Sequence, residues 1–151
     1  MPTGNPRYRR PAVASPAHRL AMLRLALAGE PRYVIDPREL SDSATGYTVD
    51  SLHALKQQYG GDAVLHLIMG GDQYAKLDSW HRPDEVKRLA RIAVVARPRF
   101  DIQAKGATVV PMEPLAISAS DIRARVARGE DIAPLVPPAV ANYIRREGLY
   151  T

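Results

Sequence analysis

Two nearly continuous apolar runs constrain the fold of this chain more than any other feature. They occupy residues 64–69 and 92–96, and residues 83–89, which have a helical pattern, lie between them. A strand with so few polar residues is typical of a parallel sheet that is covered on both faces. Short apolar stretches at residues 33–36 and 108–110 add two further expected strands.

Helix signals alternate with these strands. Ser15, followed by Pro16, predicts the start of a helix that ends near Gly29. Three leucines at helical spacing fall on one face of this helix, namely Leu20, Leu23 and Leu27. Thr48 is a suitable cap for a second helix, which residues 60–61, both glycine, should end.

Two more helices are expected to begin near Ser118 and Pro137, whereas residues 1–14, rich in proline, glycine and arginine, are typical of a loop. This alternation of strand and helix predicts a doubly wound, Rossmann-like parallel α/β sheet in a single domain that spans residues 1–151. In such folds ligands bind beyond the carboxyl ends of the strands.

The composition narrows the classes of function. Without cysteine, the chain can form neither a disulfide nor a thiolate metal site, and a cytoplasmic location fits. No apolar run approaches the roughly 20 residues that span a bilayer. The net charge of +5 favours anionic ligands but does not separate nucleotides from nucleic acid or a membrane surface. One Phe and one Trp are few aromatics for a platform that binds single strands.

A glycine-rich turn follows the first apolar run, at the expected carboxyl end of a strand. Gly70 and Gly71 let a ligand approach the backbone, and Asp72 can accept hydrogen bonds from ribose hydroxyls. A Gly-Gly-Asp turn is also an ordinary strand exit. Trp80, the only tryptophan, offers a flat face on which a heteroaromatic ring can stack. A core position is the alternative for Trp80, but the polar loop around it favours a site.

Residues 117–123 predict a second binding element at the start of a helix. Ser118 and Asp121 have the spacing of a capping box. The free backbone N–H groups of the first turn and the hydroxyls of Ser118 and Ser120 can bind a phosphate. Arg123 is placed for the same anion, although pairing with a surface acid is the alternative for this side chain.

Together these motifs resemble those of the bacterial nicotinate-nucleotide adenylyltransferases, a family of the nucleotidyltransferase α/β phosphodiesterase group. The resemblance covers nearly the whole chain and implies the Rossmann-like fold of the nucleotidyltransferase superfamily. Seven segments carry it, at residues 2–6, 18–23, 46–49, 72–80, 97–98, 117–123 and 143–150.

The resemblance implies that the chain transfers the adenylyl group of ATP to nicotinate mononucleotide. The products would be deamido-NAD and pyrophosphate, in NAD biosynthesis, with Mg²⁺ as a helper. On the mononucleotide side, Trp80 would stack on the nicotinate ring. Backbone amides around Thr48 and His81 would hold the carboxylate of that ring, and Asp72 would bind ribose.

The resemblance also implies a set of ATP-binding residues. Arg123 would clamp phosphates, and Ser120 and Arg123 would act in catalysis, while no residue is assigned to a metal. The whole ATP-binding set comprises Arg9, Arg97, Ser118, Ala119, Ser120 and Arg123.

The chain departs from the family pattern at its beginning. Family members begin with a strand, a Gly-x-Phe-x-Pro-x-His-x-Gly-His loop and a helix. The four histidines of this chain form no His-x-Gly-His pair; they are His18, His53, His66 and His81. We therefore expect an N-terminally truncated sheet that lacks one strand-helix-strand unit, with unpaired edges and poor stability. An upstream start or a truncated gene would explain this pattern.

Three other hypotheses stay open. A truncated, noncatalytic member would bind nicotinate mononucleotide without releasing pyrophosphate. A nucleic-acid binder rests on positive charge alone and predicts salt-dependent binding of DNA or RNA. A pantetheine-phosphate or nicotinamide-mononucleotide adenylyltransferase would differ in substrate competition. We expect ATP and nicotinate mononucleotide as partners, with no nucleic acid or membrane, and leave a homo-oligomer open.

Overall fold

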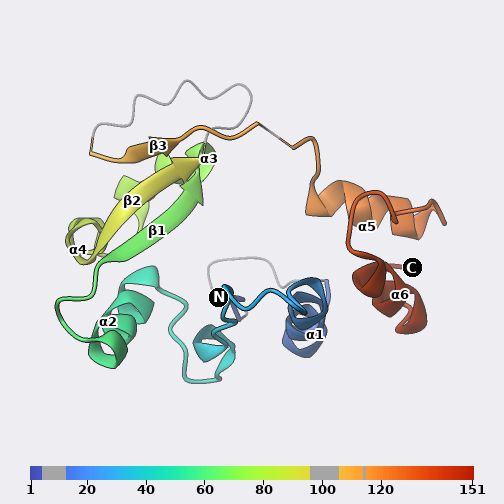
Figure 1. Ribbon diagram of the computed structural model, residues 1–151, viewed down its shortest axis with the longest axis horizontal. Helices are drawn as coiled ribbons and strands as arrows, with labels where there is room; N and C mark the ends of the chain where they lie inside the picture. The colour runs from blue at the N-terminus through green and yellow to red at the C-terminus, as the bar shows by residue number, and fades with distance from the viewer. Residues whose placement is uncertain (5–12, 96–105, 114) are drawn as a thin grey trace. The chain divides into compact units, whose positions relative to one another are not determined.

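The computed structural model describes residues 1–4, 13–95, 106–113 and 115–151 (Figure 1). These residues form two compact units, one of Met1–Gly46 with Ala116–Thr151 and one of Tyr47–Leu115, and each unit has its own hydrophobic core. The single domain expected over residues 1–151 stays a prediction. Most of the expected N-terminal loop lies outside the described residues.

The Tyr47–Leu115 unit contains a parallel three-stranded sheet in the order β1-β2-β3. Its strands are β1 (Leu65–Gly70), β2 (Ala90–Val95) and β3 (Thr108–Val110). Helix α4 (Pro83–Leu89) makes the crossover from β1 to β2, as a parallel pair requires. The strands predicted at residues 64–69, 92–96 and 108–110 are confirmed, with the first two shifted by one or two positions.

Three further elements accompany the sheet in this unit. They are α2 (Thr48–Tyr59), the short α3 (Gly71–Tyr74) and the 3₁₀ turn η2 (Leu77–Ser79). Helix α2 ends at Gly60, whose φ of 95° suits glycine, so the predicted end is confirmed.

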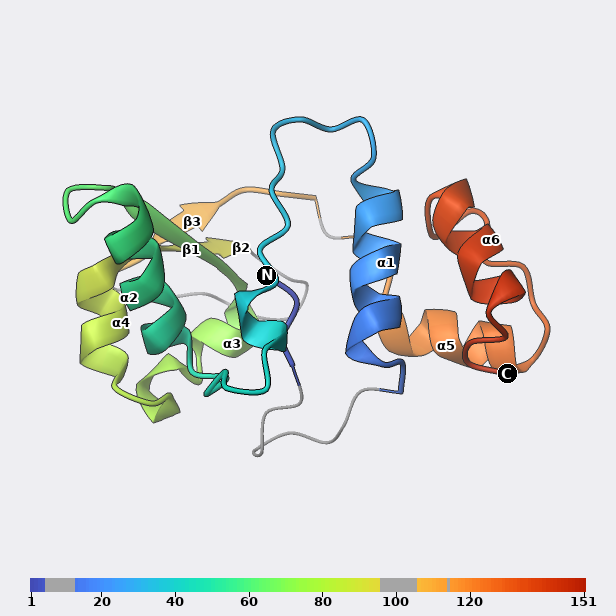
Figure 2. The ribbon, with the colours of Figure 1, turned by 90° about the horizontal axis from the view of Figure 1, so that it is seen from below.

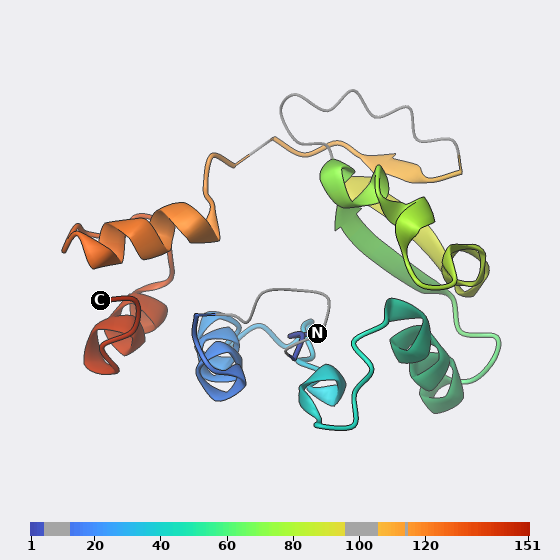
Figure 3. The ribbon, with the colours of Figure 1, turned by 180° about the vertical axis from the view of Figure 1, so that it is seen from behind.

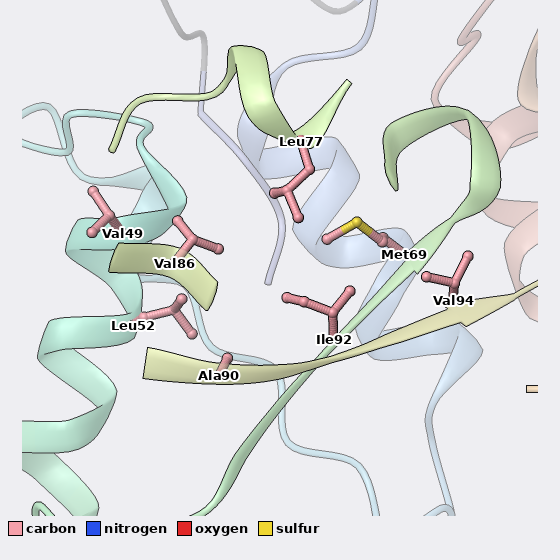
Figure 4. Packing of buried hydrophobic residues seen from close by; sticks show 8 residues of the cluster. All are labelled: Val49, Leu52, Met69, Leu77, Val86, Ala90, Ile92 and Val94. Carbon is pink, nitrogen blue, oxygen red and sulfur yellow. The ribbon is translucent and has the colours of Figure 1, made fainter. Parts of the chain in front are cut away.

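One core joins these elements, and Figure 4 shows its side chains meeting between α2, α4 and the sheet. Burial of each large apolar side chain contributes roughly 1.5–3 kcal/mol. The members are Val49, Leu52, Met69, Leu77, Val86, Ala90, Ile92 and Val94. The opposite face of β1 carries His66 and Ile68, and Ile68 is 68% exposed. Cover on both faces of β1 was therefore a wrong prediction, because α2, η2 and α4 all pack against the face that holds Met69.

The other unit is helical and is formed by segments from the two ends of the sequence (Figure 2). Its elements are α1 (Pro16–Ala26), the 3₁₀ turn η1 (Arg38–Leu40), α5 (Ala119–Ala127) and α6 (Pro138–Arg146). Figure 3 shows α1, α5 and α6 grouped together, and Met22 of α1 and Ile122 of α5 pack against a core that includes Ile144. The oxygen of Ser15 accepts a hydrogen bond from the backbone N–H of His18, so the predicted cap of α1 is confirmed.

One prediction for this unit is wrong. Residues 33–36 form no strand, and Val34 is 81% exposed. Instead, the carboxylate of Asp36 accepts from the backbone N–H of Arg38 at 3.0 Å and from its Nε at 2.6 Å, which turns the chain into η1. Leu23 of α1 is exposed, because Met22 and Leu25 make the contacts with the core. None of the described helices is long and apolar enough to cross a bilayer.

Candidate functional site

The carboxyl end of β1 carries the first predicted site residue, Asp72. Strand β1 ends at Gly70, and α3 begins at the buried Gly71, with Asp72 in its first turn. Asp72 is half-buried, and the Nε2 of Gln73 donates to its Oδ2 at 3.2 Å. Since Gly70 pairs with Val95 at the end of β2, Asp72 follows the edge of the sheet at which open α/β folds bind ligands.

Trp80 lies at the end of the connection that runs from α3 through η2. Its backbone N–H donates to the carbonyl of Leu77 at 3.0 Å, and its ring is half-buried against the core. The ring therefore fits both the core position and the stacking role considered for Trp80, because part of it packs against the core and the rest stays accessible. A ring fixed on one side can present its remaining surface to another flat ring.

The structure brings His81 against Tyr47, the residue before Thr48. The rings of Tyr47 and His81 stack with centroids 4.2 Å apart and planes inclined by 26°, so the start of α2 lies beside the turn that follows Trp80. Thr48 is the first residue of α2 and not its cap, which is Tyr47 without a side-chain capping bond. The prediction of Thr48 as the helix cap was therefore wrong. The backbone N–H groups of Thr48 and Val49 still lie in the first turn of α2, where they lack intrahelical acceptors and can bind an anion.

A network of His53, Glu85 and Arg82 next to this turn was not predicted from the sequence. The Nε2 of His53 on α2 lies 2.8 Å from Oε1 of Glu85 on α4, and the guanidinium of Arg82 pairs with Oε2 of the same carboxylate. The side chain of Glu85 is 16% exposed. The hydrogen bond from His53 and the charge of Arg82 lower the pKa of Glu85, against the opposing effect of burial. Glu85 therefore stays ionised near neutral pH.

The second predicted element is the first turn of α5, in the other unit. The Oγ of Ser118 accepts from the backbone N–H of Asp121 at 3.1 Å, so the predicted cap is confirmed. The carboxylate of Asp121 pairs instead with Arg125 at 2.9 Å. Of the two bonds of a capping box, the one accepted by Ser118 is therefore the one that forms. The guanidinium of Arg123 donates to Oγ of Ser120 at 3.2 Å. Ser118, Ala119 and Ser120 are all exposed.

This turn supplies three kinds of donor for an oxyanion. They are the first backbone N–H groups of a helix, two hydroxyls, and a guanidinium held by one of those hydroxyls. In the described part of the chain, Arg125 of α5 pairs with Asp121 and Arg128, just after the helix, pairs with Glu130, whereas Arg123 has no ion pair. The arrangement can bind a phosphate. Arg9 and Arg97, the other predicted ATP-binding residues, lie outside the described residues.

A cavity of about 1010 Å³ opens at the amino ends of β1 and β2, where it is lined by Leu65 and Ala90. Among the residues that the structure describes, no predicted site residue lines it. Within the described ranges, no three His, Asp or Glu side chains cluster as a ready-made metal site.

The comparisons with known proteins agree with this fold. A cytidylyltransferase-like family model matches residues 1–125. Probable nicotinate-nucleotide adenylyltransferases of Laribacter hongkongensis and Thermomicrobium roseum are 43% and 41% identical to this chain. Each alignment covers 99% of this chain, and they cover 79% and 75% of the two relatives, respectively.

The solved structures confirm the predicted nucleotidyltransferase fold. The Plasmodium falciparum nicotinic acid mononucleotide adenylyltransferase complexed with NaAD superposes with a TM-score of 0.76 at 18% identity, covering 97% of this chain and 78% of that one. The same protein complexed with APC gives a TM-score of 0.73 over 91% and 76% of the two chains. The chain therefore belongs to the nicotinate-nucleotide adenylyltransferase family of cytidylyltransferase-like proteins.

Proposed function

We propose that this chain transfers AMP from ATP to nicotinate mononucleotide in NAD biosynthesis. A phosphate oxygen of the mononucleotide attacks the α-phosphorus of ATP, the bond from that phosphorus to the bridging oxygen breaks, and pyrophosphate leaves with deamido-NAD as the product. Family membership supports the reaction. The observation that carries its assignment to residues is the stack of Tyr47 on His81, which joins the start of α2 to the turn after Trp80. ATP as the substrate favours the cytoplasm as the compartment.

The mononucleotide half has a chemical role for each predicted residue. Trp80 stacks on the pyridine ring, because its half-buried indole is fixed by the core on one side. Backbone N–H groups at Thr48 and around His81 hold the ring carboxylate, since a helix start attracts anions. Asp72, at the carboxyl edge of the sheet, accepts from ribose hydroxyls.

The ATP half binds and stabilises phosphate charge. Arg123 and Ser120 act on the phosphates during transfer, and Ser118 and Ala119 contribute the start of α5. Arg9 and Arg97 complete this half by the sequence resemblance. Such a transfer needs little covalent help from a protein, so positioning of the two phosphates and stabilisation of charge supply the rate.

Mg²⁺ is part of the same proposal. A cluster of protein ligands is not required, because Mg²⁺ in phosphoryl-transfer sites is held chiefly by substrate phosphates with one or two carboxylates. When bound, it would neutralise charge on the ATP phosphates. The residues of the ATP half bind and orient those phosphates whether or not a protein side chain also binds the Mg²⁺.

Product analysis tests the proposal. The purified chain is incubated with ATP, Mg²⁺ and nicotinate mononucleotide, and deamido-NAD and pyrophosphate are quantified by mass spectrometry and a coupled assay. We expect equal amounts of the two products. Binding of the mononucleotide without pyrophosphate release would contradict the proposal and favour a noncatalytic member of the family.

A further inference from the structure

We infer that Glu85 is a positioning residue of the mononucleotide site. By holding Arg82 and His53 at once, it fixes the turn that carries Trp80 and His81 beside the first turn of α2. The inference rests on the proposed function for its substrate. It assigns to Glu85 no contact with that substrate.

The backbone of Arg82 has an unusual conformation. Its φ of 53° and ψ of 58° are left-handed, a conformation that is sterically unfavourable for a residue with a side chain. Arg82 directly follows the turn of Trp80 and His81, so a change in its φ and ψ would redirect both. Its carbonyl accepts from the backbone N–H groups of Glu85 and Val86, each at 3.1 Å. Pairing of its guanidinium with Glu85 adds a side-chain restraint to the same conformation.

Glu85 also links α4 to α2 through His53. An ionised carboxylate only accepts hydrogen bonds, so Nε2–H of His53 donates to Oε1 of Glu85 over 2.8 Å. His53 belongs to the same helix as Thr48, which opens it. Together with the stack of Tyr47 on His81, the bond gives two cross-links between α2 and the segment that carries the turn. The two predicted carboxylate-binding positions therefore keep a fixed separation.

Asp84, the neighbouring acid, differs from Glu85 in its contacts. Asp84 and Glu85 both lie in the first turn of α4, where either charge favours the helix. Asp84 is exposed, whereas Glu85 is mostly covered and reaches two other segments. Asp84→Asn therefore removes the same charge from the same turn without loosening the site, and it is the matched control for Glu85→Gln.

Steady-state kinetics of the full chain test the inference. We expect Glu85→Gln to raise the KM for nicotinate mononucleotide about tenfold, with the KM for ATP changed by less than about twofold. Asp84→Asn should leave both values near those of the unmodified chain. An unchanged mononucleotide KM in Glu85→Gln would overturn the inference. Equal losses in both KM values and in kcat would also overturn it, because they indicate a general structural role.

Trp80 provides a readout that does not depend on turnover. It is the only tryptophan, so quenching of its fluorescence by acrylamide reports on this turn alone. We expect stronger quenching in Glu85→Gln than in Asp84→Asn, and equal quenching would contradict a positioning role. If the unmodified chain forms no deamido-NAD, the proposed function fails, and the role of Glu85 is then decided by this quenching.

Two substitutions of Arg82 separate conformation from charge. Arg82→Ala and Arg82→Gly both remove the guanidinium, but only glycine adopts the left-handed conformation without steric penalty. We therefore expect Arg82→Ala to raise the mononucleotide KM several times more than Arg82→Gly does. Equal increases would contradict the part assigned to the left-handed backbone, because the loss common to both variants is that of the guanidinium paired with Glu85.

Discussion

The two halves of the proposed site are built in different ways. The mononucleotide half depends on contacts between distant segments, since Tyr47, His53, His81 and Glu85 join α2 to α4 and to the turn between η2 and α4. The ATP half lies within one helical turn, where Ser118 bonds to the N–H of Asp121 and Arg123 bonds to Ser120. Recognition of a flat ring requires a fixed scaffold, whereas a phosphate requires only exposed donors of the right charge. Substitutions in the two halves should therefore have different kinetic effects.

The largest effect is expected for Arg123→Ala in the ATP half. We predict a fall in kcat of roughly 10²–10³-fold, because a donor aimed at developing charge is lost. Thermal stability should change little, since the hydrogen bond of Arg123 joins it to Ser120 within the same helix. Arg125→Ala is the control, because Arg125 of the same helix pairs with Asp121. Similar kcat values for the two variants would remove Arg123 from the proposed catalytic set.

Trp80→Ala should give the next largest effect, in the mononucleotide half. We predict a rise of roughly 10- to 100-fold in the KM for nicotinate mononucleotide, from lost stacking, and less than about twofold in the KM for ATP. Because Trp80 also packs against the core, Trp80→Phe serves as a milder variant that keeps a flat ring. Equal effects on both substrates would contradict the division of the site into two halves.

Tyr47→Ala should have a smaller effect of the same kind. Loss of the stack on His81 is expected to raise the KM for the mononucleotide about two- to tenfold, the range of an aromatic pair. Tyr59→Ala is a suitable control, because Tyr59 is an exposed aromatic residue at the other end of α2. A larger KM change in the control would show that α2 is sensitive to any aromatic substitution.

The smallest effect concerns stability against acid. The pKa of Glu85 is lowered in the folded chain by His53 and by the charges of Arg82 and Arg88. The resulting stabilisation is present above the pKa of an unfolded Glu, about 4.3, and is lost as the pH falls through the lower native value. Urea unfolding from pH 7 to acid should therefore show a smaller loss in Glu85→Gln than in the unmodified chain. An identical loss would contradict this coupling.

Glu130 extends this comparison to the helical unit. Arg128 lowers the pKa of Glu130 in the same sense, but this pair is more exposed and is screened by solvent. Glu130→Gln should therefore alter the acid response less than Glu85→Gln. A larger change in Glu130→Gln would show that the network around Glu85 does not contribute more to stability against acid than the exposed pair of Arg128 and Glu130.

Local signals in the sequence were sufficient to predict the first turn of α5. The spacing of Ser118 and Asp121 predicts the cap that the structure has, and Pro83 with the apolar runs predicts α4 and the strands beside it. These features depend on neighbours along the chain. The strand expected at residues 33–36 was wrong because a strand also needs a partner, which its composition cannot supply.

The network around Glu85 could not be predicted from spacing. His53 and Glu85 are 32 positions apart, and their bond exists only because α2 and α4 pack on the same face of the sheet. The left-handed conformation of Arg82 has no sequence signal either, since glycine is the usual residue there. The sequence shows only that His53 lies in the helix predicted after Thr48 and that Glu85 lies in the one predicted at residues 83–89.

The ratio of kcat/KM for nicotinate mononucleotide over nicotinamide mononucleotide tests the central claim most directly. Both substrates have the same size and phosphate, so the ratio isolates recognition of the ring carboxylate by the helix start at Thr48 and the turn at His81. We predict a preference for the acid of at least about tenfold, because backbone N–H donors favour a carboxylate over an amide. Equal values, or a preference for the amide, would contradict the account.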